Sequence, residues 1–370
     1  MNFLVVPDSF KGSLTSEKIC ALSKTMILKK FPSSIVNAYP AADGGEGSVE
    51  TITAITNGKT VGGKVNDGNF FVKNATYGVN GDTAYISIAN SSGLPDTMIK
   101  NPEFTTSYGF GQQIKQAIGL GKRKICLCLG GSSTNDGGAG AAVALGAKFI
   151  NANGEEFTPT GGNLKDIVTA DFTELKKIIN GIEFCALCDV KNPLLGKNGC
   201  SYIYAPQKGA KSETVLEELD KNMEHYAKIV CGENFEDFEG GGAAGGLGFF
   251  VKAVLGGELV PGAQYFLDLI NFDENAKNAD YIITGEGKFD ATSNQGKICG
   301  SIGKRCEDLG KKATVFCGVT DAEILPNGIR KIYEINDENK TLQENMSASE
   351  ENFINTFEKF LADVEIENRK

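Results

Sequence analysis

The sequence predicts an α/β protein in which a doubly wound domain with a parallel sheet is interrupted by a second α/β domain. Three observations support this prediction. Short apolar strands alternate with helical segments at both ends of the 370-residue chain, the middle section has a different strand pattern, and glycine-rich acidic loops follow several strands. Strands that alternate with helices of this length indicate βαβ units and a parallel sheet. We expect residues 1–65 and 272–370 to form the first domain and residues 66–271 the inserted one.

The N-terminal section reads twice as a strand, a loop and a helix. The apolar strand at 3–7 (FLVVP) is followed by a loop and a helical segment at 14–31. The strand at 35–40 (IVNAYP) is followed by a glycine-rich loop and a helix at 48–58. Beyond that helix, polar and apolar residues alternate around an Asn-Gly turn signal, which predicts antiparallel strands.

The alternation of strands and helices returns in the middle and at the end of the chain. Apolar strands are predicted within KICLCLGG, GIEFCALCDV, ADYIITGEG, KATVFCGVT and IRKIYEIN. The charged stretch at 336–352 has few apolar residues and reads as a surface loop. The segment at 353–366 reads as the terminal helix.

Composition argues against several classes of function. The formal net charge of −10 disfavours nucleic acid and anionic membranes as partners, because both attract clustered Lys and Arg. No apolar stretch is long enough for a membrane span and no signal peptide is evident, so we expect a cytoplasmic protein. His225 is the only histidine, which argues against Ser-His-Asp and Cys-His mechanisms and His-bound metals. Its charged surroundings predict a solvated helix face.

Ten cysteines are scattered through the chain, several of them within apolar strands. In a protein of this class we interpret them as reduced cytosolic thiols. Cys126 and Cys128 alternate along one predicted strand, and Cys185 and Cys188 form a C-x-x-C. A structural zinc site usually shows two such pairs flanked by turns. We therefore interpret all four as small core residues rather than as metal ligands or a redox pair.

Five loops combine glycine with carboxylate, and each follows a predicted strand. They are PDSFKGS, ADGGEGS, GGSSTNDGGAG, CDVKNP and TGEGKFD. Ligands of open α/β folds bind at the C-terminal edge of the parallel sheet. There, backbone amides can hold phosphate oxygens, carboxylates can hold Mg²⁺, and Lys11, Lys208 and Lys297 can neutralise transferring oxygens. Phosphoryl transfer works by positioning and electrostatics and needs no histidine, so this inventory favours that chemistry.

The same residues also have purely structural interpretations. Asp136 can cap the helix that follows it, Asp43 can belong to a turn, and Lys11 and Lys208 can be exposed turn lysines. Asp189 is harder to explain in this way, because a carboxylate that ends an apolar strand needs a partner. The chain has no P-loop and no G-x-G-x-x-G at its first helix, so a nucleotide would bind outside those families.

Seven stretches together resemble the class I glycerate kinase family, the bacterial type that includes glycerate 2-kinases. They are PDSFKGSLTS (7–16), ADGGEGS (42–48), GGSSTNDGGAG (130–140), CDVKNPLLGKNG (188–199), PQKGA (206–210), GGGAAGGLG (240–248) and ITGEGKFD (283–290). The resemblance implies phosphorylation of D-glycerate by ATP with Mg²⁺, at the 2-hydroxyl to give 2-phosphoglycerate. It also implies a flavodoxin-like domain that carries the inserted α/β domain, with the active site between them.

Carried onto this sequence, the family motifs point to a set of polar residues. They are Asp8, Ser9, Lys11, Asp43, Glu46, Asn135, Asp136, Asp189, Asn192, Lys208, Glu286, Asp290 and Lys297. Five positions depart from residues that are common in the family: Ser87, Gln112, Ser133, Thr292 and Cys299. The departures at Ser87 and Thr292 leave open an altered affinity or a neighbouring hydroxy acid as the substrate.

We assign roles within this region by chemistry. Asp189 is the expected base or orienting group at the acceptor hydroxyl, and Asp8, Lys11 and Lys208 are the other expected catalytic residues. The expected ATP-binding residues are Gly130, Gly131, Ser132, Ser133, Thr134, Asn135, Gly285, Glu286 and Lys297. The expected metal ligands are Asp43, Asp136 and Asp290. The backbone of residues 240–246 is a further candidate for contacting ATP phosphates.

Three other functions stay open: a Mg²⁺-dependent phosphohydrolase, a kinase for a related small hydroxy acid, and a non-catalytic sugar-acid sensor. The choice between 2- and 3-phosphoglycerate also stays open, because regiochemistry depends on sub-ångström placement of the acceptor. The sequence likewise leaves open whether the chain forms a homo-oligomer.

Overall fold

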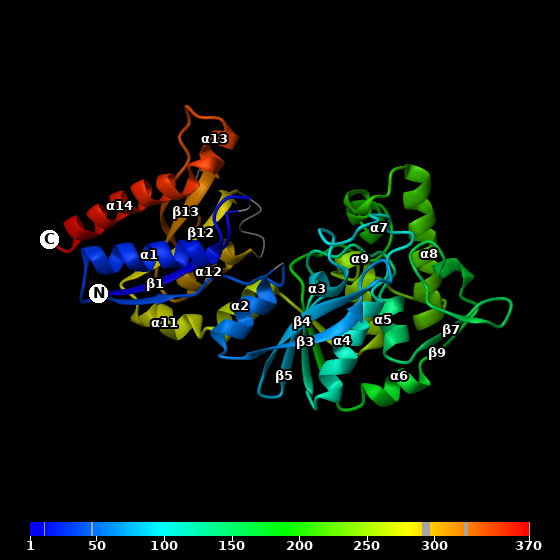
Figure 1. Ribbon diagram of the computed structural model, residues 1–370. Helices are drawn as coiled ribbons and strands as arrows, with labels where there is room; N and C mark the ends of the chain where they lie inside the picture. The colour runs from blue at the N-terminus through cyan, green and yellow to red at the C-terminus, as the bar shows by residue number, and fades with distance from the viewer. Residues whose placement is uncertain (11, 46, 291–296, 322–324, 370) are drawn as a thin grey trace. The chain divides into compact units, whose positions relative to one another are not determined.

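The structure is a computed structural model that describes the chain except for residues 11, 46, 291–296, 322–324 and 370 (Figure 1). The chain divides into two compact units. The first unit comprises Met1–Asp43 and Ala263–Lys370, and the second comprises Gly44–Gly262. The chain therefore leaves the first unit after residue 43 and re-enters it at residue 263, where the sequence predicted boundaries after 65 and at 272.

The first unit is built on a five-stranded parallel sheet. In spatial order its strands are β14 (Ile329–Glu334), β13 (Ala313–Thr320), β12 (Tyr281–Phe289), β1 (Asn2–Pro7) and β2 (Ile35–Ala38). Counted along the chain within this unit, the spatial order is 2-1-3-4-5, which is the order of flavodoxin-like doubly wound folds. The order reverses between β1 and β12. The predicted α/β fold with a parallel sheet is confirmed.

Helices cover both faces of this sheet. The helices of the unit are α1 (Ser16–Lys30), α10 (Gly262–Leu269), α11 (Phe272–Asn278), α12 (Ile298–Asp308), α13 (Leu342–Ser347) and α14 (Ser349–Glu367). α1 and α14 pack over the face that carries Phe3, Ile283 and Phe316 (Figure 1). Strand alternation turns Leu4 and Ile282 to the opposite face, and α11 and α12 contact these strands. The sheet is thus buried between two helical layers, as parallel sheets require.

The stretch at 336–352 is not the loop that its polarity predicted, because it contains α13 and the start of α14. A capping box begins α13. Thr341 Oγ1 accepts the N–H of Glu344 (3.3 Å), and Glu344 Oε2 accepts the N–H of Thr341 (2.8 Å). These reciprocal bonds satisfy N–H groups that the first helical turn leaves without partners, so a polar segment becomes helical.

The second unit contains a six-stranded mixed sheet. In spatial order its strands are β11 (Glu258–Val260), β10 (Glu183–Leu187), β6 (Lys124–Cys128), β5 (Thr83–Ser87), β4 (Val72–Asn80) and β3 (Lys59–Asn66). The first four run parallel, whereas β4 and β3 are antiparallel additions. This confirms the antiparallel strands predicted around the Asn-Gly turn. A smaller sheet consists of β8 (Glu156–Phe157), β7 (Lys148–Ile150) and β9 (Thr169–Asp171).

The helices of the second unit pack around these sheets. They are α2 (Ser48–Ile55), α3 (Ile88–Ser92), α4 (Tyr108–Gly119), α5 (Ala139–Ala144), α6 (Thr173–Ile178), α7 (Cys200–Tyr204), α8 (Glu213–Cys231) and α9 (Ala243–Phe249), with the short turns η1 (Leu164–Asp166), η2 (Pro206–Lys208) and η3 (Phe250–Val254). Ile125 and Leu127 of β6 face the main core. His225 lies on α8 but is only partly exposed, because its Nε2 lies 2.7 Å from the carbonyl oxygen of Ile167.

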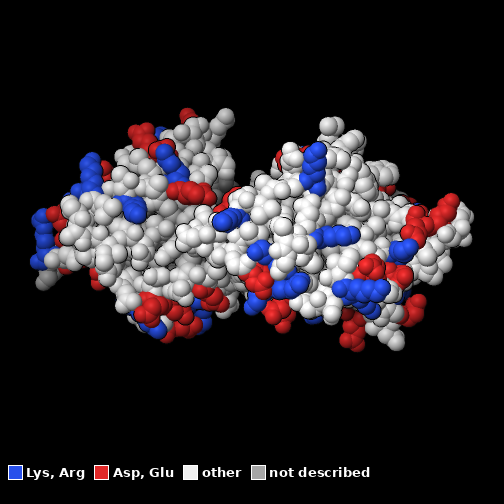
Figure 2. Space-filling view, turned by 60° about the horizontal axis from the view of Figure 1, so that its bottom comes forward, with Lys and Arg blue, Asp and Glu red and all other residues white. Residues whose placement is uncertain are grey.

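Charges of both signs are interspersed on the face of the protein that Figure 2 shows. Surface ion pairs occur in both units, such as Lys148 with Glu156 (2.6 Å) and Lys18 with Glu350 (2.8 Å). Exposed pairs of this kind contribute little to stability, because water screens them. Within the described part of the chain, no helix is long and apolar enough to cross a bilayer.

Candidate active site

Two of the predicted acidic motifs meet in the first unit, where the end of β1 lies beside β12. The TGEGKFD motif is not the loop that the sequence predicted, because β12 continues through it to Phe289. Pro7 pairs with Gly285 in the strand register, and the N–H of Asp8 donates to the carbonyl oxygen of Gly285 (2.8 Å). Asp8 is half-buried, and its Oδ1 accepts the N–H of Ser9 (2.7 Å). In this fold the crevice where the strand order reverses is the usual ligand site. Asp8 and Glu286 both lie at that position.

Glu286 is almost fully buried beside a lysine that is not. Its Oε2 lies 3.7 Å from Nζ of Lys297, which is 48% exposed and immediately precedes α12. Burial raises the pKa of the Cys299 thiol well above its ordinary value, and the negative charges of Glu286 and Asp8 raise it further. The first unit therefore brings the carboxylates of Asp8 and Glu286 near one thiol, and Lys297 lies beside Glu286.

The other acids predicted for the first unit have different surroundings. Asp290 directly follows β12 and is half-buried, and Nζ of Lys288 lies 3.4 Å from its carboxylate. Asp43 is the last residue of the first unit and is exposed. Three residues singled out in the sequence lie outside the described part of the chain: Lys11, Glu46 and Thr292.

In the second unit, the GGSSTND loop leaves the end of β6 and is held on both sides. The N–H of Gly130 donates to the carbonyl oxygen of Gly44 (3.1 Å). Ser133 donates twice to the carbonyl oxygen of Ser92, from its N–H and from its Oγ, at 2.9 Å each. Gly131 lies between these two anchors, exposed and with a left-handed φ of 80°. The loop therefore has a fixed shape, with Gly131 at its accessible turn.

A buried lysine packs against the same loop. Lys208 is 2% exposed, and its Nζ donates to Ser132 Oγ (2.9 Å) and to the carbonyl oxygen of Thr134 (2.7 Å). Burial lowers the pKa of Lys208 to about 8, although nearby Cys200 and Asp136 act in the opposite direction. An ammonium group has three N–H donors, and the third finds no acceptor among the described residues. Lys208 is thus not the exposed turn lysine of the structural interpretation.

The surroundings of Asp136 favour a structural role over the predicted metal site. The side chain is fully buried, and its Oδ2 accepts from both the N–H (2.7 Å) and the Oγ (2.8 Å) of Ser107. The N–H groups of Gly138 (3.1 Å) and Gly140 (3.3 Å), at the start of α5, also donate to this carboxylate. Burial raises the pKa of Asp136, and these four bonds counteract the rise. A fully buried carboxylate that accepts four hydrogen bonds suits a structural role at the start of α5 better than a metal site.

Two buried oxygens next to Asp136 lack hydrogen-bond partners among the residues that the structure describes. Asn135 donates from Nδ2 to Ser201 Oγ (3.1 Å), but its Oδ1 accepts no hydrogen bond within the described part of the chain. The same holds for Oγ1 of Thr134. Unsatisfied buried oxygens are uncommon in native proteins, and water or a ligand donor usually satisfies them. These two oxygens belong to the GGSSTND loop on which Lys208 packs, so the loop and the lysine together offer polar groups that a ligand could satisfy.

The glycine-rich segment that follows residue 240 packs directly on the GGSSTND loop. Gly245 accepts a hydrogen bond from the N–H of Gly137 (3.0 Å). A Cβ at Gly245 would lie 2.0 Å from the carbonyl oxygen of Thr134, so only glycine permits this approach. The segment was expected to contact ATP phosphates. In this structure its glycines allow two backbone segments to meet.

Asp189 follows β10, the neighbour of β6. Leu187 pairs with Cys128 in the register, so Asp189 and the GGSSTND loop begin at the same edge of the sheet. Asp189 is half-buried, and its Oδ1 accepts the N–H of Gly262 (2.8 Å). Asn192, from the same motif, accepts from the hydroxyl of Tyr204 (2.6 Å) through its Oδ1. The second unit thus gathers a carboxylate, a buried cation and a loop at one sheet edge.

Sequence reasoning missed several partners in this region. Ser107, Ser201 and Tyr204 hold Asp136, Asn135 and Asn192 respectively. Each lies outside the motif that it supports, and a serine or tyrosine in or next to a helix carries no signal of such a role. The departure at position 87 has a local explanation, because Ser87 is buried and its Oγ caps α3 by accepting the N–H of Ala89 (3.2 Å).

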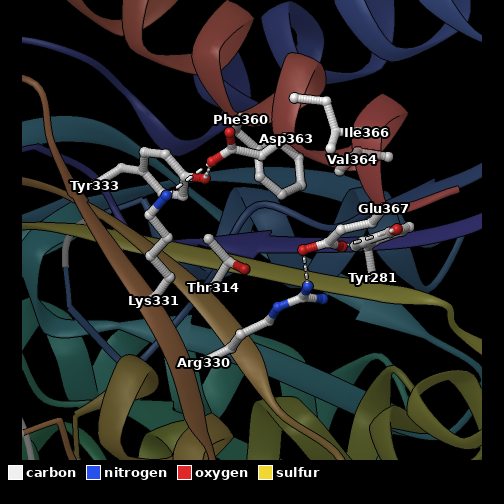
Figure 3. Close-up of a pocket in the computed structure, with 10 residues that line it drawn as sticks. All are labelled: Tyr281, Thr314, Arg330, Lys331, Tyr333, Phe360, Asp363, Val364, Ile366 and Glu367. Carbon is white, nitrogen blue, oxygen red and sulfur yellow. Dashed lines mark hydrogen bonds and ion pairs between the residues drawn. The ribbon is translucent and has the colours of Figure 1, made fainter. Parts of the chain in front are cut away.

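A cavity of about 260 Å³ in the first unit contains none of the predicted site residues (Figure 3). It is lined by side chains of β12, β13, β14 and α14. Its charged groups are already paired: Lys331 with Asp363 (2.7 Å) and Arg330 with Glu367. Because each cation in the cavity is neutralised by its partner carboxylate, the cavity is a weaker candidate for binding an anionic substrate than the GGSSTND loop with Lys208.

The donor set allows a test of whether Mg²⁺ fits. No group of three or more His, Cys, Asp or Glu suited to a metal occurs in the described ranges. In nucleotide sites, however, Mg²⁺ takes only one or two carboxylates together with phosphate oxygens and waters. Asp8 and Glu286 offer such a pair, and their joint negative charge acts on Cys299. Mg²⁺ therefore fits the first-unit pair better than the enclosed Asp136.

Comparison with known proteins identifies the class. The chain is 37% identical to a glycerate kinase from Bacillus cereus, over the full length of both chains. It is 39% identical to a glycerate 2-kinase from Escherichia coli K12, with 80% of each chain covered. A crystal structure described as a glycerate kinase 2 from Salmonella typhimurium LT2 matches all of both chains with a TM-score of 0.87 and 31% identity. The protein is an enzyme of the phosphotransferase class.

The family match is equally extensive. Residues 3–365 match the model of the glycerate kinase family. The chain therefore belongs to the glycerate kinase family, and the resemblance inferred from its seven motifs is confirmed.

Proposed function

We propose that the protein transfers the γ-phosphoryl group of ATP to the 2-hydroxyl of D-glycerate, giving ADP and 2-phosphoglycerate. The observation that carries this proposal is the buried Lys208, whose third N–H meets no acceptor among the described residues beside the GGSSTND loop. A desolvated cation at a fixed loop suits an anionic, transferring group. The relative from Escherichia coli that is named a glycerate 2-kinase supports the choice of hydroxyl.

Asp189 is the proposed acceptor of the hydroxyl proton. In the reaction, the bond from the γ-phosphorus to the bridging oxygen breaks, and a bond from phosphorus to the glycerate oxygen forms. The displaced hydroxyl proton passes to the carboxylate, which the N–H of Gly262 orients (2.8 Å). Since phosphoryl transfer depends chiefly on positioning, orientation of the hydroxyl is part of the same role.

The second unit would stabilise the charge that moves in the reaction. Lys208 neutralises a phosphoryl or carboxylate oxygen, and its low pKa of about 8 still leaves it charged at neutral pH. Gly131 is the exposed residue of the loop and so the proposed backbone contact to ATP. We assign Asp136 as a positioning residue, because its bonds to Ser107, Gly138 and Gly140 fix the end of the loop.

The first unit supplies the proposed metal-binding carboxylates. Asp8 and Glu286 would hold Mg²⁺, with Asp43 and Asp290 as further candidates. When bound, the ion neutralises the charge of the polyphosphate. Lys297 immediately precedes α12, where free backbone N–H groups also favour anions, so we propose that it contacts a phosphate oxygen.

A cytoplasmic location is proposed on the basis of the ten cysteines, none of which forms a disulfide. Reduced thiols are typical of that compartment.

The proposal is tested by incubating the purified chain with ATP and Mg²⁺ and with D-glycerate, L-glycerate, tartronate or no acceptor. ADP release is followed by a coupled assay, and phosphorus NMR identifies the product. We expect ADP release that depends on D-glycerate and the signal of 2-phosphoglycerate. A 3-phosphoglycerate signal would overturn the assigned hydroxyl, and a higher kcat/KM for tartronate would overturn the assigned acid. Turnover of no acid at all would contradict the kinase itself.

A further inference from the structure

Two cysteines lie opposite one another in the sheet of the second unit. β6 and β10 are neighbouring parallel strands, and Cys126 pairs directly with Cys185 in their register. Both side chains point to the same face, because the flanking Ile125, Leu127 and Phe184 belong to the core on the other face. Neighbouring strands lie about 4.8 Å apart. A disulfide spans Cα atoms about 4.4–6.8 Å apart, so this pair is within bridging distance.

The two thiols differ in their access to solvent. Cys126 is 1% exposed, whereas Cys185 is half-buried. A hydrogen bond with Cys126 lowers the pKa of Cys185, although burial and the charge of Glu258 oppose this. The nearby Cys188 behaves differently, because burial raises its pKa and its thiol donates to the carbonyl oxygen of Val190 (3.3 Å). An accessible thiol backed by a buried one has the arrangement of an attacking and a resolving cysteine.

We propose that Cys185 and Cys126 form a reversible disulfide that lowers the turnover of the enzyme. The oxidant is a small-molecule disulfide. The thiolate of Cys185 attacks one of its sulfurs, forms a mixed disulfide and expels one thiolate. The Sγ of Cys126 then attacks the Sγ of Cys185 and expels the second. The two protein thiols lose two protons and two electrons, and the small-molecule disulfide becomes two thiols.

The bridge would act on the strands that carry the candidate loops. Gly130 lies four residues after Cys126, and Asp189 lies four residues after Cys185. A disulfide most often holds its two Cα atoms about 5.5–6 Å apart, which is wider than the strand spacing of about 4.8 Å. Its formation therefore changes the local spacing of β6 and β10 and shifts both loops.

The expected effect on turnover is large. A misplacement of about 1 Å can cost roughly 10²-fold in rate, so we expect oxidation to lower turnover roughly tenfold or more. This effect rests on the proposed kinase function, whereas formation of the disulfide does not.

The test uses the full chain, reduced, freed of reductant and incubated with L-cystine. Mass spectrometry of an unreduced digest should find the peptides of Cys126 and Cys185 joined, at a mass lower by two hydrogens. ADP release that depends on D-glycerate should fall in parallel and return with dithiothreitol. The Cys185→Ala variant should keep its activity during the same treatment. The matched control Cys231→Ala, which removes an exposed thiol on α8, should lose activity as the unmodified sequence does.

Two outcomes would overturn the proposal: no joined peptide while Cys231 reacts with the oxidant, or an oxidative loss of activity that persists in Cys185→Ala. Because Cys185 is only half-buried, its replacement tests the bridge even if Cys126→Ala does not fold. If the reduced chain shows no kinase activity, detection of the joined peptides by mass spectrometry still shows whether the disulfide forms. The two proposals can therefore fail separately.

Discussion

The candidate clusters of the two units hold their lysines in opposite surroundings. Lys297 in the first unit is 48% exposed and lies 3.7 Å from the carboxylate of Glu286. Lys208 in the second unit is 2% exposed and donates to two neutral oxygens. Water screens the charge of Lys297, whereas burial strengthens the interaction of Lys208 with a ligand. Two lysines that look equivalent in the sequence should therefore contribute unequally to the reaction.

The largest effect is expected from removing the proposed proton acceptor of the second unit. Asp189→Asn should lower kcat roughly 10²–10⁴-fold, the range of general-base contributions, with a small change in KM. Steady-state kinetics with D-glycerate measures this. Asp166→Asn, at an exposed carboxylate of the same unit, is the matched control and should behave as the unmodified sequence. Turnover of Asp189→Asn within a few-fold of normal would exclude the assigned role.

The second-largest effect is expected for Lys208→Met. It should lower kcat/KM roughly 10²–10³-fold, because it removes a desolvated positive charge that stabilises the oxygens of the transferred group. Its thermal stability should change little or rise, since a buried cation is replaced by an apolar side chain. Kinetics and thermal unfolding together separate the two effects. Lys211→Met, at an exposed lysine three residues away, serves as the control. Equal losses in both variants would contradict a special role for the buried lysine.

Asp136→Asn should destabilise the second unit by about 1–3 kcal/mol, because an amide cannot accept all the donors that the carboxylate satisfies. The partner at the same site is Ser107, which donates to Asp136 twice. Denaturant unfolding of Asp136→Asn, Ser107→Ala and the double variant forms a mutant cycle. We expect the two effects to be strongly non-additive. Unchanged stability together with a raised requirement for Mg²⁺ would instead restore the metal assignment.

A pH profile should reveal the buried lysine directly. The pKa of Lys208 is lowered from 10.5 to about 8, so its charge is lost as pH rises through about 8, and kcat/KM should fall about tenfold per pH unit above that value. Stability has the opposite sign. Between about pH 8 and 10.5 the folded state has released a proton that the unfolded state keeps, so the contribution of this group to stability increases with pH.

The variant Lys208→Arg sharpens this measurement. A guanidinium stays charged throughout this range, so the alkaline fall in kcat/KM near pH 8 should disappear in any residual activity. An unchanged profile in Lys208→Arg would assign the fall to another group.

The smallest effect is expected in the first unit. Lys297→Met should lower kcat/KM by less than about tenfold, because the charge that it removes is exposed and screened. The loss should grow at low ionic strength, where screening weakens. Kinetics at two salt concentrations measures this, with Lys304→Met on the same helix as the control. A loss as large as that of Lys208→Met would remove the contrast between the two units.

Local sequence patterns were enough to predict most of the elements. Continuous apolar runs such as FLVVP and YIITG become the central strands β1 and β12, because a strand buried on both faces needs apolar residues on both. The main error lay at 336–352. There, the capping pair Thr341 and Glu344 outweighs low hydrophobicity. The spacing T-x-x-E was visible in the sequence and would have predicted the start of α13.

The chemistry of individual side chains was less predictable than the loops that carry them. The sequence predicted a functional role for the GGSSTND loop but left Asp136 open between a helix cap and a metal ligand. Asp136 is fully buried, and two of its hydrogen bonds come from Ser107, which lies 29 positions earlier in the chain. Similarly, the sequence presented Cys185 beside Cys188 as a C-x-x-C, whereas the sheet register pairs Cys185 with Cys126.

The sequence by itself determined the α/β fold class, acid-bearing loops after strands such as GGSSTND after β6, and the membership of the glycerate kinase family. These follow from local patterning and from motifs that survive as contiguous letters. Only the tertiary structure decided which lysine is buried, which carboxylate is enclosed and which thiols face each other. Those properties depend on desolvation and on contacts between distant segments, and neither is encoded in the neighbours of a residue along the chain.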